Sequence, residues 1–244
     1  MSDRLVIIPT YNEKENVENI IRCVLSLEPR FDVLIIDDNS PDGTAGIVEG
    51  LQHEFSDLYM IRREGKFGLG TAYIAGFKWA LQREYRYVLE MDADFSHNPK
   101  DLVRLYNSCV NGADVSIGSR YVTGVNVVNW PMSRVLLSYF ASRYVRFITG
   151  MNVHDATAGF VCYTRRVLET ICLDQIRFKG YAFQIEMKFT AKTLGFVLEE
   201  VPIIFTDRTL GSSKMSKGIV REAVIGVITM KIRALMGRVK GRNV

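Results

Sequence analysis

Histidine is scarce in this 244-residue chain, cysteines are few, and long hydrophobic runs are missing. The three histidines, His53, His97 and His154, stand at no triad-like spacing from a serine, so nucleophilic hydrolase chemistry is disfavoured. The four cysteines form no C-x-x-C pair and show no metal-binding spacing, which predicts reduced thiols in a cytosolic protein.

Two further absences concern membranes and secretion. No segment reaches about 18 uninterrupted apolar residues, so no transmembrane helix is predicted. The first four residues lead directly into a short apolar strand, which predicts that no signal peptide opens the chain. A hydrophobic content of 48% nevertheless supports a packed core, and the length suits one large α/β domain or two small ones.

The net charge of +4 is unevenly distributed. From residue 208 to the end there are nine lysines and arginines against one acid, a net charge of +8, whereas residues 1–207 carry a net charge of −4. The excess positive charge therefore belongs to the C-terminal tail. It points to phosphate or to an anionic membrane surface as a partner.

Apolar runs alternate with amphipathic helical segments along the chain. Strands are predicted at residues 5–9, 33–36, 58–62, 87–91, 114–121 and 199–205, and another ends at residue 163. This alternation predicts an α/β fold with a doubly wound, mostly parallel sheet flanked by helices. Pro202 predicts an edge position for the last strand. Asn12 and Glu15 resemble a capping box at the start of the first helix.

Two carboxylates, Asp92 and Asp94, follow the apolar run at 87–91. Asn98 and Pro99 then resemble the N-cap and first residue of a helix. The carboxyl end of a parallel strand is where open α/β sheets bind ligands, and two carboxylates there can hold a divalent cation on a diphosphate. The alternative is a solvated turn.

Charged side chains follow several predicted strands. Acids come early, at Glu13, Asp37, Asp38, Asp92 and Asp94, and cations come late, at Arg120, Arg134, Arg208 and Lys214. If the sheet brings these groups together, one site contains a metal-binding carboxylate set and a ring of anion-binding groups. The glycine-rich residues 65–72 carry neither the dinucleotide fingerprint nor a Walker A motif, and they predict a turn that is either near the site or purely structural.

Two interpretations remain open for each of several segments. Residues 131–150 and 218–236 are amphipathic, with arginines and lysines among apolar side chains, and fit either a membrane interface or ordinary core packing. Asp155 and Thr157 form either a turn or part of the site. Gln184 and Glu186 fit either the site or a solvated helix face.

Five motifs, in this order along the chain, resemble the motifs of a known family. They lie at residues 9–13, 37–44, 92–94, 118–121 and from Arg208 to Lys214. The chain resembles the inverting GT-A glycosyltransferases of family 2, and within them the polyprenol-phosphate (dolichol-phosphate) mannosyltransferases. The match covers about residues 4–216, and the ordered set is specific for the family but less specific for the sugar.

The resemblance implies a GT-A (Rossmann-like) catalytic domain over 1–216, which includes an acceptor and interface segment at 122–154. A basic amphipathic helix and tail would occupy 217–244. Mannose would pass from GDP-mannose to a polyprenyl or dolichyl phosphate. The alternatives are UDP-glucose or another donor with the same lipid, a nucleotidyltransferase, and a non-catalytic membrane-binding module. A nucleic-acid partner is not expected.

The same resemblance implies residue roles. Residues that would hold the nucleoside are Pro9, Tyr11, Glu13, Ile36 and Asp38. Asp92 and Asp94 would hold Mg²⁺ or Mn²⁺ on the diphosphate, beside the Ala93 backbone. Phosphates would be neutralised by Arg120, Arg208 and Lys214. Arg120, Arg134 and Ser138 would contact the acceptor phosphate.

The chain departs from the family pattern at Ser96, where some relatives have a metal-binding glutamine. A direct metal contact from Ser96 is therefore not expected. Because this chain ends without the C-terminal membrane spans of many relatives, the resemblance implies peripheral attachment to the cytoplasmic face of a membrane. Small membrane-anchoring subunits would be possible partners.

Overall fold

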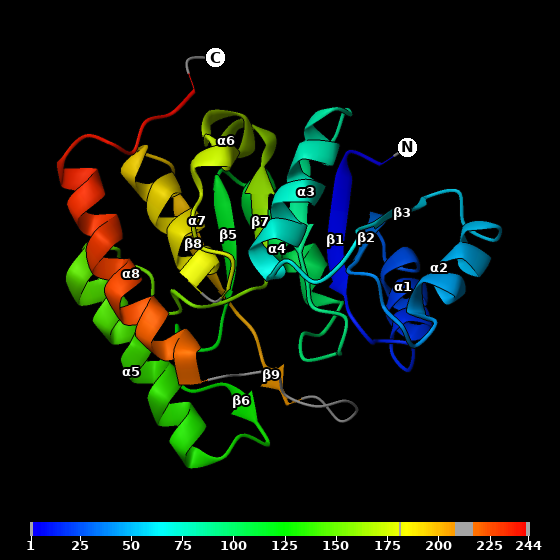
Figure 1. The fold of residues 1–244 in the computed structure, drawn as a ribbon, viewed down its shortest axis with the longest axis horizontal. Helices are drawn as coiled ribbons and strands as arrows, with labels where there is room; N and C mark the ends of the chain where they lie inside the picture. The colour runs from blue at the N-terminus through cyan, green and yellow to red at the C-terminus, as the bar shows by residue number, and fades with distance from the viewer. Residues whose placement is uncertain (1, 181, 208–216, 243–244) are drawn as a thin grey trace.

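The structure is a computed structural model, and it describes residues 2–180, 182–207 and 217–242, with side chains omitted for 217–223. A seven-stranded sheet forms its centre, in the order β3-β2-β1-β4-β7-β5-β8 (Figure 1). Its strands are β1 (Arg4–Thr10), β2 (Asp32–Asp37), β3 (Leu58–Arg62), β4 (Tyr87–Glu90), β5 (Val115–Ser119), β7 (Val161–Thr164) and β8 (Leu198–Pro202).

Strand β7 pairs antiparallel with both β4 and β5, and the other pairings in the sheet are parallel. The predicted mostly parallel sheet is therefore confirmed. The predicted edge position of Pro202 is also confirmed, because β8 closes one side of the sheet. A separate pair, β6 (Val127–Val128) with β9 (Phe205–Thr206), lies below the main sheet in Figure 1.

Helices cover both faces of the sheet, as expected for a doubly wound fold. On one face lie α1 (Val17–Leu25), α2 (Thr44–Gln52) and α4 (Asp101–Val110). On the other lie α3 (Leu69–Leu81), α6 (Arg165–Thr170), α7 (Ala182–Thr193) and the short 3-10 helix η1 (Leu173–Gln175). Successive residues of β1 point to opposite faces, so Val6 and Ile8 pack under α1 whereas Leu5 and Ile7 pack under α3.

Two long helices, α5 (Met132–Thr149) and α8 (Lys217–Leu235), lie side by side at the margin beyond α7 (Figure 1). The Lys231 Nζ donates to the Thr149 carbonyl at 3.0 Å, which satisfies the C-terminal end of α5. Arg233 bridges to Glu186 of α7 at 3.4 Å. The amphipathic segments thus pack on the domain through one face each, and the division at residue 216 stays a prediction.

The first predicted helix cap is wrong, and the second lies in a turn that precedes its helix. Asn12 adopts a left-handed φ of 56°, and α1 begins only at Val17, so Asn12 and Glu15 form no capping box. Asn98 instead accepts the Lys100 N–H at 3.1 Å in a turn, and α4 begins at Asp101. In both cases the chain reverses at the end of a strand before it enters the helix, and the asparagine belongs to that reversal.

The loops after β1 and β2 are tied together by Asp37. Its carboxylate accepts the Thr10 hydroxyl at 3.0 Å and the Ser40 hydroxyl at 2.6 Å. The Ser40 oxygen in turn accepts the Asn12 N–H at 3.0 Å. Asp37 is therefore a scaffold for the loops, and its neighbour Asp38 is the carboxylate left at the edge of the sheet.

Gly70 explains part of the glycine-rich segment at 65–72. A Cβ atom on Gly70 would lie 2.7 Å from the Phe183 ring, and the Gly70 N–H donates to the Lys179 carbonyl at 2.8 Å. This glycine lets α3 approach α7 closely. The role of Gly70 is packing, whereas its neighbour Leu69 lines a cavity at the carboxyl edge of the sheet, so the segment also lies near the predicted site.

Candidate active site

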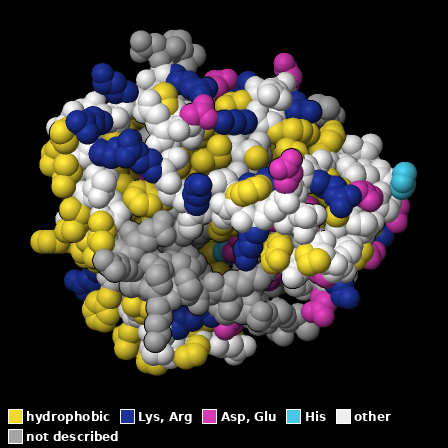
Figure 2. All heavy atoms as spheres, in the orientation of Figure 1, with side chains coloured by type: hydrophobic (Ala, Val, Ile, Leu, Met, Phe, Trp, Pro, Cys, Tyr) yellow, Lys and Arg dark blue, Asp and Glu magenta, His cyan; other side chains and the backbone are white. Residues whose placement is uncertain are grey.

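A cavity of about 360 Å³ opens at the carboxyl edge of the sheet. Asp92 and Asp94 line it from the loop after β4, and Arg120 lines it from the loop after β5. Arg134 and Ser138 line it from α5. Figure 2 shows a hollow near the middle of this face, with charged side chains and a histidine at its rim. Two of the predicted acids and two of the predicted cations therefore meet in one cavity.

The residues expected to hold the nucleoside lie at the same edge, but outside the lining of this cavity. They are Pro9, Tyr11, Glu13, Ile36 and Asp38, and Ala93 also lies outside the lining. Pro9 pairs with Ile36 across β1 and β2, and the Ile36 side chain is fully buried in the core. Only its backbone could therefore meet a ligand. Arg208 and Lys214 lie outside the described residues.

Asp38 is held by a nearby arginine. The Arg63 Nε donates to the Asp38 Oδ1 at 2.6 Å. Burial raises the pKa of the Asp38 carboxyl, and the Arg63 bond and charge only partly oppose this effect. Lys66 lies 4.6 Å from the centre of the Tyr11 ring, which places a cation beside the expected nucleoside contact.

Arg120 is fixed by a bidentate ion pair. Its Nε and Nη2 donate to the two carboxylate oxygens of Asp155, each at 2.6 Å, and Nη2 also donates to the Thr157 hydroxyl at 2.9 Å. Asp155 is fully buried. Burial raises its pKa, but the Arg120 charge and hydrogen bonds outweigh this and hold the pKa below its ordinary value. Asp155 and Thr157 thus belong to the site.

Arg134 lines the cavity from α5. Its Nη1 bridges to Asp207 at 2.8 Å, and its guanidinium lies 4.1 Å from the centre of the Trp130 ring. The Arg120 guanidinium lies 5.4 Å from the same ring. Both guanidinium groups therefore contact the Trp130 ring, a residue to which no sequence motif assigned a role.

The turn after β4 presents oxygen atoms. Phe95 adopts a left-handed φ of 58°, and the Asp94 Oδ1 accepts the Ser96 N–H at 3.1 Å. The Ser96 hydroxyl is buried in the cavity lining and has no hydrogen-bond partner within the described part of the chain. Hard oxygen donors of this kind fit Mg²⁺ or Mn²⁺.

No cluster of three or more His, Cys, Asp or Glu residues that could hold a metal occurs among the described residues. Two carboxylates are nevertheless sufficient for a cation whose other ligands are substrate phosphates and water, which is how Mg²⁺ is commonly held. The residues present therefore fit a metal that arrives with a diphosphate.

His97 also lines the cavity, although no sequence motif predicts a site role for it. Its ring stacks on Phe160 at 4.7 Å and meets the edge of Phe205 at 5.2 Å. Burial lowers the pKa of His97 to about 4, with a smaller opposing effect from Asp94. The ring is therefore neutral near pH 7. Its position directly after the D-x-D turn was the signal available in the sequence.

A buried polar cluster adjoins the cavity through Gln184, which belongs to both. The Gln184 Nε2 donates to the Glu90 Oε2 at 2.9 Å, and Lys188 donates to the carbonyls of Ala156 and Ala158 at 3.3 and 2.6 Å. Burial raises the pKa of Glu90 and lowers that of Lys188. Gln184 and Glu186 are both buried, so the solvated-face interpretation is wrong. Lys188 holds the loop that carries Asp155.

Four buried polar atoms in the lining have no hydrogen-bond partner within the described ranges. They are the Ser96 hydroxyl, the His97 Nδ1, the Trp130 Nε1 and the Gln184 Oε1. Unsatisfied buried polar groups are rare in folded proteins, because each costs about 1–3 kcal/mol. Their concentration in one cavity indicates a ligand site.

The model of the family described as "Glycosyl transferase family 2" matches residues 5–172 of this chain. The chain belongs to this family and is a glycosyltransferase, which confirms the resemblance found in the sequence. It is 48% identical to a polyprenol monophosphomannose synthase of Mycolicibacterium smegmatis, covering 97% of this chain and 90% of the relative. It is also 48% identical to an undecaprenyl-phosphate mannosyltransferase of Micrococcus luteus, covering 91% of each.

Solved structures agree on the fold. Glucosyl-3-phosphoglycerate synthase of Mycobacterium tuberculosis with bound UDP is similar with a TM-score of 0.65 and 16% identity, covering 95% of this chain and 79% of that one. A second structure of the same enzyme, with Mn²⁺, UDP and glucosyl-3-phosphoglycerate, also has a TM-score of 0.65, with 18% identity and coverage of 96% and 79%. At this identity the likeness concerns the fold alone.

Proposed function

We propose that this chain transfers mannose from GDP-mannose to a polyprenyl phosphate and releases GDP. The observation that carries this proposal is the cavity itself, which is lined by two carboxylates and two arginines. Its remaining wall is largely apolar, from residues such as Leu137, Val224 and Val227. An acceptor with a phosphate head and a hydrocarbon tail matches this lining. The names of the two relatives at 48% identity support the same acceptor and sugar.

Each reactant would use a different part of the edge. The nucleoside would lie over the ends of β1 and β2, near Tyr11 and Asp38. Its diphosphate would reach Asp92 and Asp94, which would hold Mg²⁺ or Mn²⁺. The bound cation supplies positive charge that stabilises the leaving diphosphate. Arg208 and Lys214 would add to that charge, and this assignment stays a prediction.

The acceptor phosphate would lie between Arg120 and Arg134, with Ser138 as a further hydrogen-bond partner. A phosphate oxygen is already anionic near neutral pH, so no general base is required. That oxygen attacks the anomeric carbon, the bond from this carbon to the diphosphate oxygen breaks, and GDP leaves with the bonding electrons. Attack in line with the leaving group inverts the anomeric configuration. The work of the protein is to hold two anions together, and fixed arginines do this well.

The proposal includes docking at a membrane, because the acceptor is a lipid. No helix in the described ranges combines the length and hydropathy needed to cross a bilayer. The outer faces of α5 and α8 expose large apolar side chains instead, which are Met132, Leu136, Leu137, Phe140, Phe147, Val224, Ile225, Ile228, Ile232 and Leu235. Hydrophobic side chains gather at this margin in Figure 2. Peripheral attachment at the cytoplasmic face, with or without small anchoring subunits, follows as part of the proposal.

The test is incubation with radiolabelled GDP-mannose, undecaprenyl phosphate and Mg²⁺, followed by solvent extraction of the lipid. Labelled mannolipid is expected from GDP-mannose. A parallel reaction with UDP-glucose tests the alternative donor. Labelled glucolipid without mannolipid would contradict the donor assignment, and label in neither lipid would contradict the acceptor.

A further inference from the structure

A second cavity, of about 620 Å³, lies on the other flank of α5. Arg143, Arg146 and Phe147 line it from the helix, and His154 lines it from the loop that follows. It shares no lining residue with the candidate active site. Nothing in the proposed transfer reaction uses it.

The charge of this cavity is positive and uncompensated. Arg143 and Arg146 form no ion pair with any carboxylate of the described residues, and α5 contains no acidic residue. The carboxylate of Glu200 bonds the His154 Nδ1 at 2.8 Å, and its side chain is only 8% exposed. In contrast, both arginines of the active-site cavity have carboxylate partners, Asp155 and Asp207. The second pair therefore presents its charge to a ligand from solvent or from a surface.

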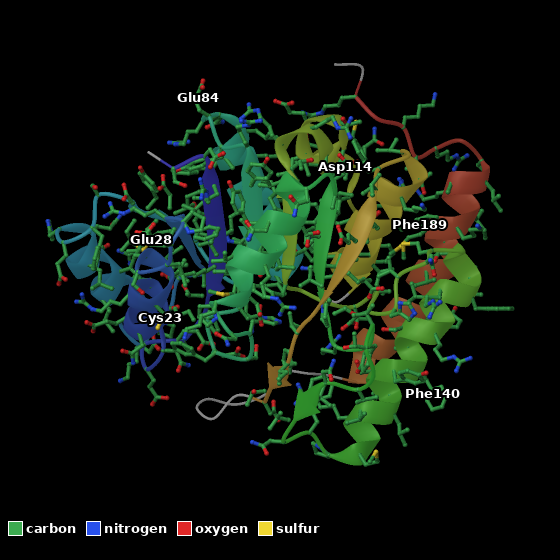
Figure 3. All side chains as sticks on the ribbon, turned by 180° about the vertical axis from the view of Figure 1, so that it is seen from behind. Cys23, Glu28, Glu84, Asp114, Phe140 and Phe189 are labelled. Carbon is green, nitrogen blue, oxygen red and sulfur yellow. The ribbon has the colours of Figure 1, made fainter. Side chains whose placement is uncertain are left out.

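An apolar ridge runs along α5 beside this cavity. Leu136, Phe140 and Phe147 are exposed by 47%, 60% and 86%, and they recur at spacings of four and seven residues. Figure 3 shows Phe140 at the opposite margin of the molecule from Cys23. Phe147 belongs both to the ridge and to the cavity lining. A phenylalanine so exposed, next to unpaired arginines, is typical of a segment that lies at the boundary between lipid tails and headgroups.

We propose that the cavity binds the phosphate of an anionic phospholipid headgroup while the ridge of Leu136, Phe140 and Phe147 enters the bilayer. This inference rests on the proposed attachment of α5 to a membrane, and it names the lipid class. The bound headgroup fixes which face of α5 is directed toward the membrane. Arg134 and Ser138 lie on the other flank of the same helix. In this orientation of α5 the active-site cavity is therefore open toward lipid phosphates in the same leaflet.

The experiment is co-sedimentation of the full chain with vesicles of phosphatidylcholine alone or mixed with phosphatidylglycerol. The wild-type chain is expected to prefer the phosphatidylglycerol vesicles. The variant Arg143→Gln/Arg146→Gln should bind them about 25-fold more weakly, since each basic residue near an anionic surface contributes about fivefold. The matched control Arg30→Gln/Arg86→Gln removes the same charge at exposed positions outside α5 and the cavity lining, and should change binding less than about twofold.

Three results would overturn the headgroup site. They are equal binding to both kinds of vesicle, equal losses in the two double variants, and calorimetric binding of inorganic phosphate that depends on Arg143 and Arg146 without any vesicle. Wild-type mannose transfer to a short-chain polyprenyl phosphate in detergent is measured in parallel. Failure of that transfer contradicts the proposed function, whereas the vesicle comparison judges the headgroup site by itself.

Discussion

Replacing Asp155 by asparagine tests how the site holds its central cation. The side chain keeps its size and a hydrogen-bond acceptor, but it loses the charge that pairs with Arg120. Asp155 is fully buried and Arg120 is 8% exposed, so water cannot replace the lost partner. The guanidinium is left as a buried charge without its carboxylate.

The expected cost follows from that burial. Breaking a buried ion pair by removing one partner costs about 3–5 kcal/mol. In a chain of this size about 4 kcal/mol lowers the melting temperature by roughly 10 °C. Mannose transfer should fall by about 100-fold, because Arg120 no longer points into the cavity in one orientation. Calorimetry and the lipid-extraction assay measure the two effects.

A double variant separates stability from activity. Arg120→Met/Asp155→Leu removes both charges and fills similar space, so it should recover most of the stability lost by Asp155→Asn. Transfer should stay lost, because the cation itself is gone. If Asp155→Asn retained wild-type melting and turnover, or if the double variant transferred mannose normally, the assigned role of the pair would be refuted.

Three further predictions concern single residues. Asp94→Ala should abolish transfer while circular dichroism shows an intact fold, and retained turnover would contradict the metal assignment. Arg134→Ala should raise the KM for polyprenyl phosphate more than that for GDP-mannose in steady-state kinetics, and equal rises would argue against an acceptor contact. Burial lowers the pKa of His97 to about 4 in the folded chain. As pH falls below about 6.5, the imidazole is therefore protonated first in the unfolded chain. This effect of His97 should reduce the free energy of unfolding of the wild-type chain by about 2 kcal/mol between pH 7 and 5. In urea unfolding with EDTA present, His97→Phe should lose less stability than wild type over that range, and identical losses would contradict a buried neutral ring.

The order of elements could be predicted because the periodicity is strong. The run at 58–62 coincides with β3, and the amphipathic segments at 131–150 and 218–236 correspond closely to α5 and α8. The reversed direction of β7 could not be predicted, because a short buried strand has the same composition in either direction. The helix starts at Asn12 and Asn98 were misplaced, since asparagine serves turns as readily as caps.

In the site, residues next to strand ends were found, and residues that support them through space were missed. The meeting of Asp92, Asp94 and Arg120 follows from topology, because parallel strands place their carboxyl ends at one edge. Arg134 joins them from α5, whose packing the strand order does not determine. Lys188 and Glu90 are fully buried and contact partners far along the chain, so no local pattern reveals them. Their roles depend on packing, which the sequence does not state.

The central claim is that two anionic reactants meet in one cavity beside a single cation. Phosphorus NMR of the chain with Mn²⁺, GDP and farnesyl phosphate tests it directly, because the paramagnetic ion broadens nearby phosphorus signals. Both GDP and the lipid phosphate should broaden, and Arg134→Ala should restore a sharp signal for the lipid phosphate alone. A lipid phosphate that stays sharp with wild-type protein while GDP broadens would contradict the account.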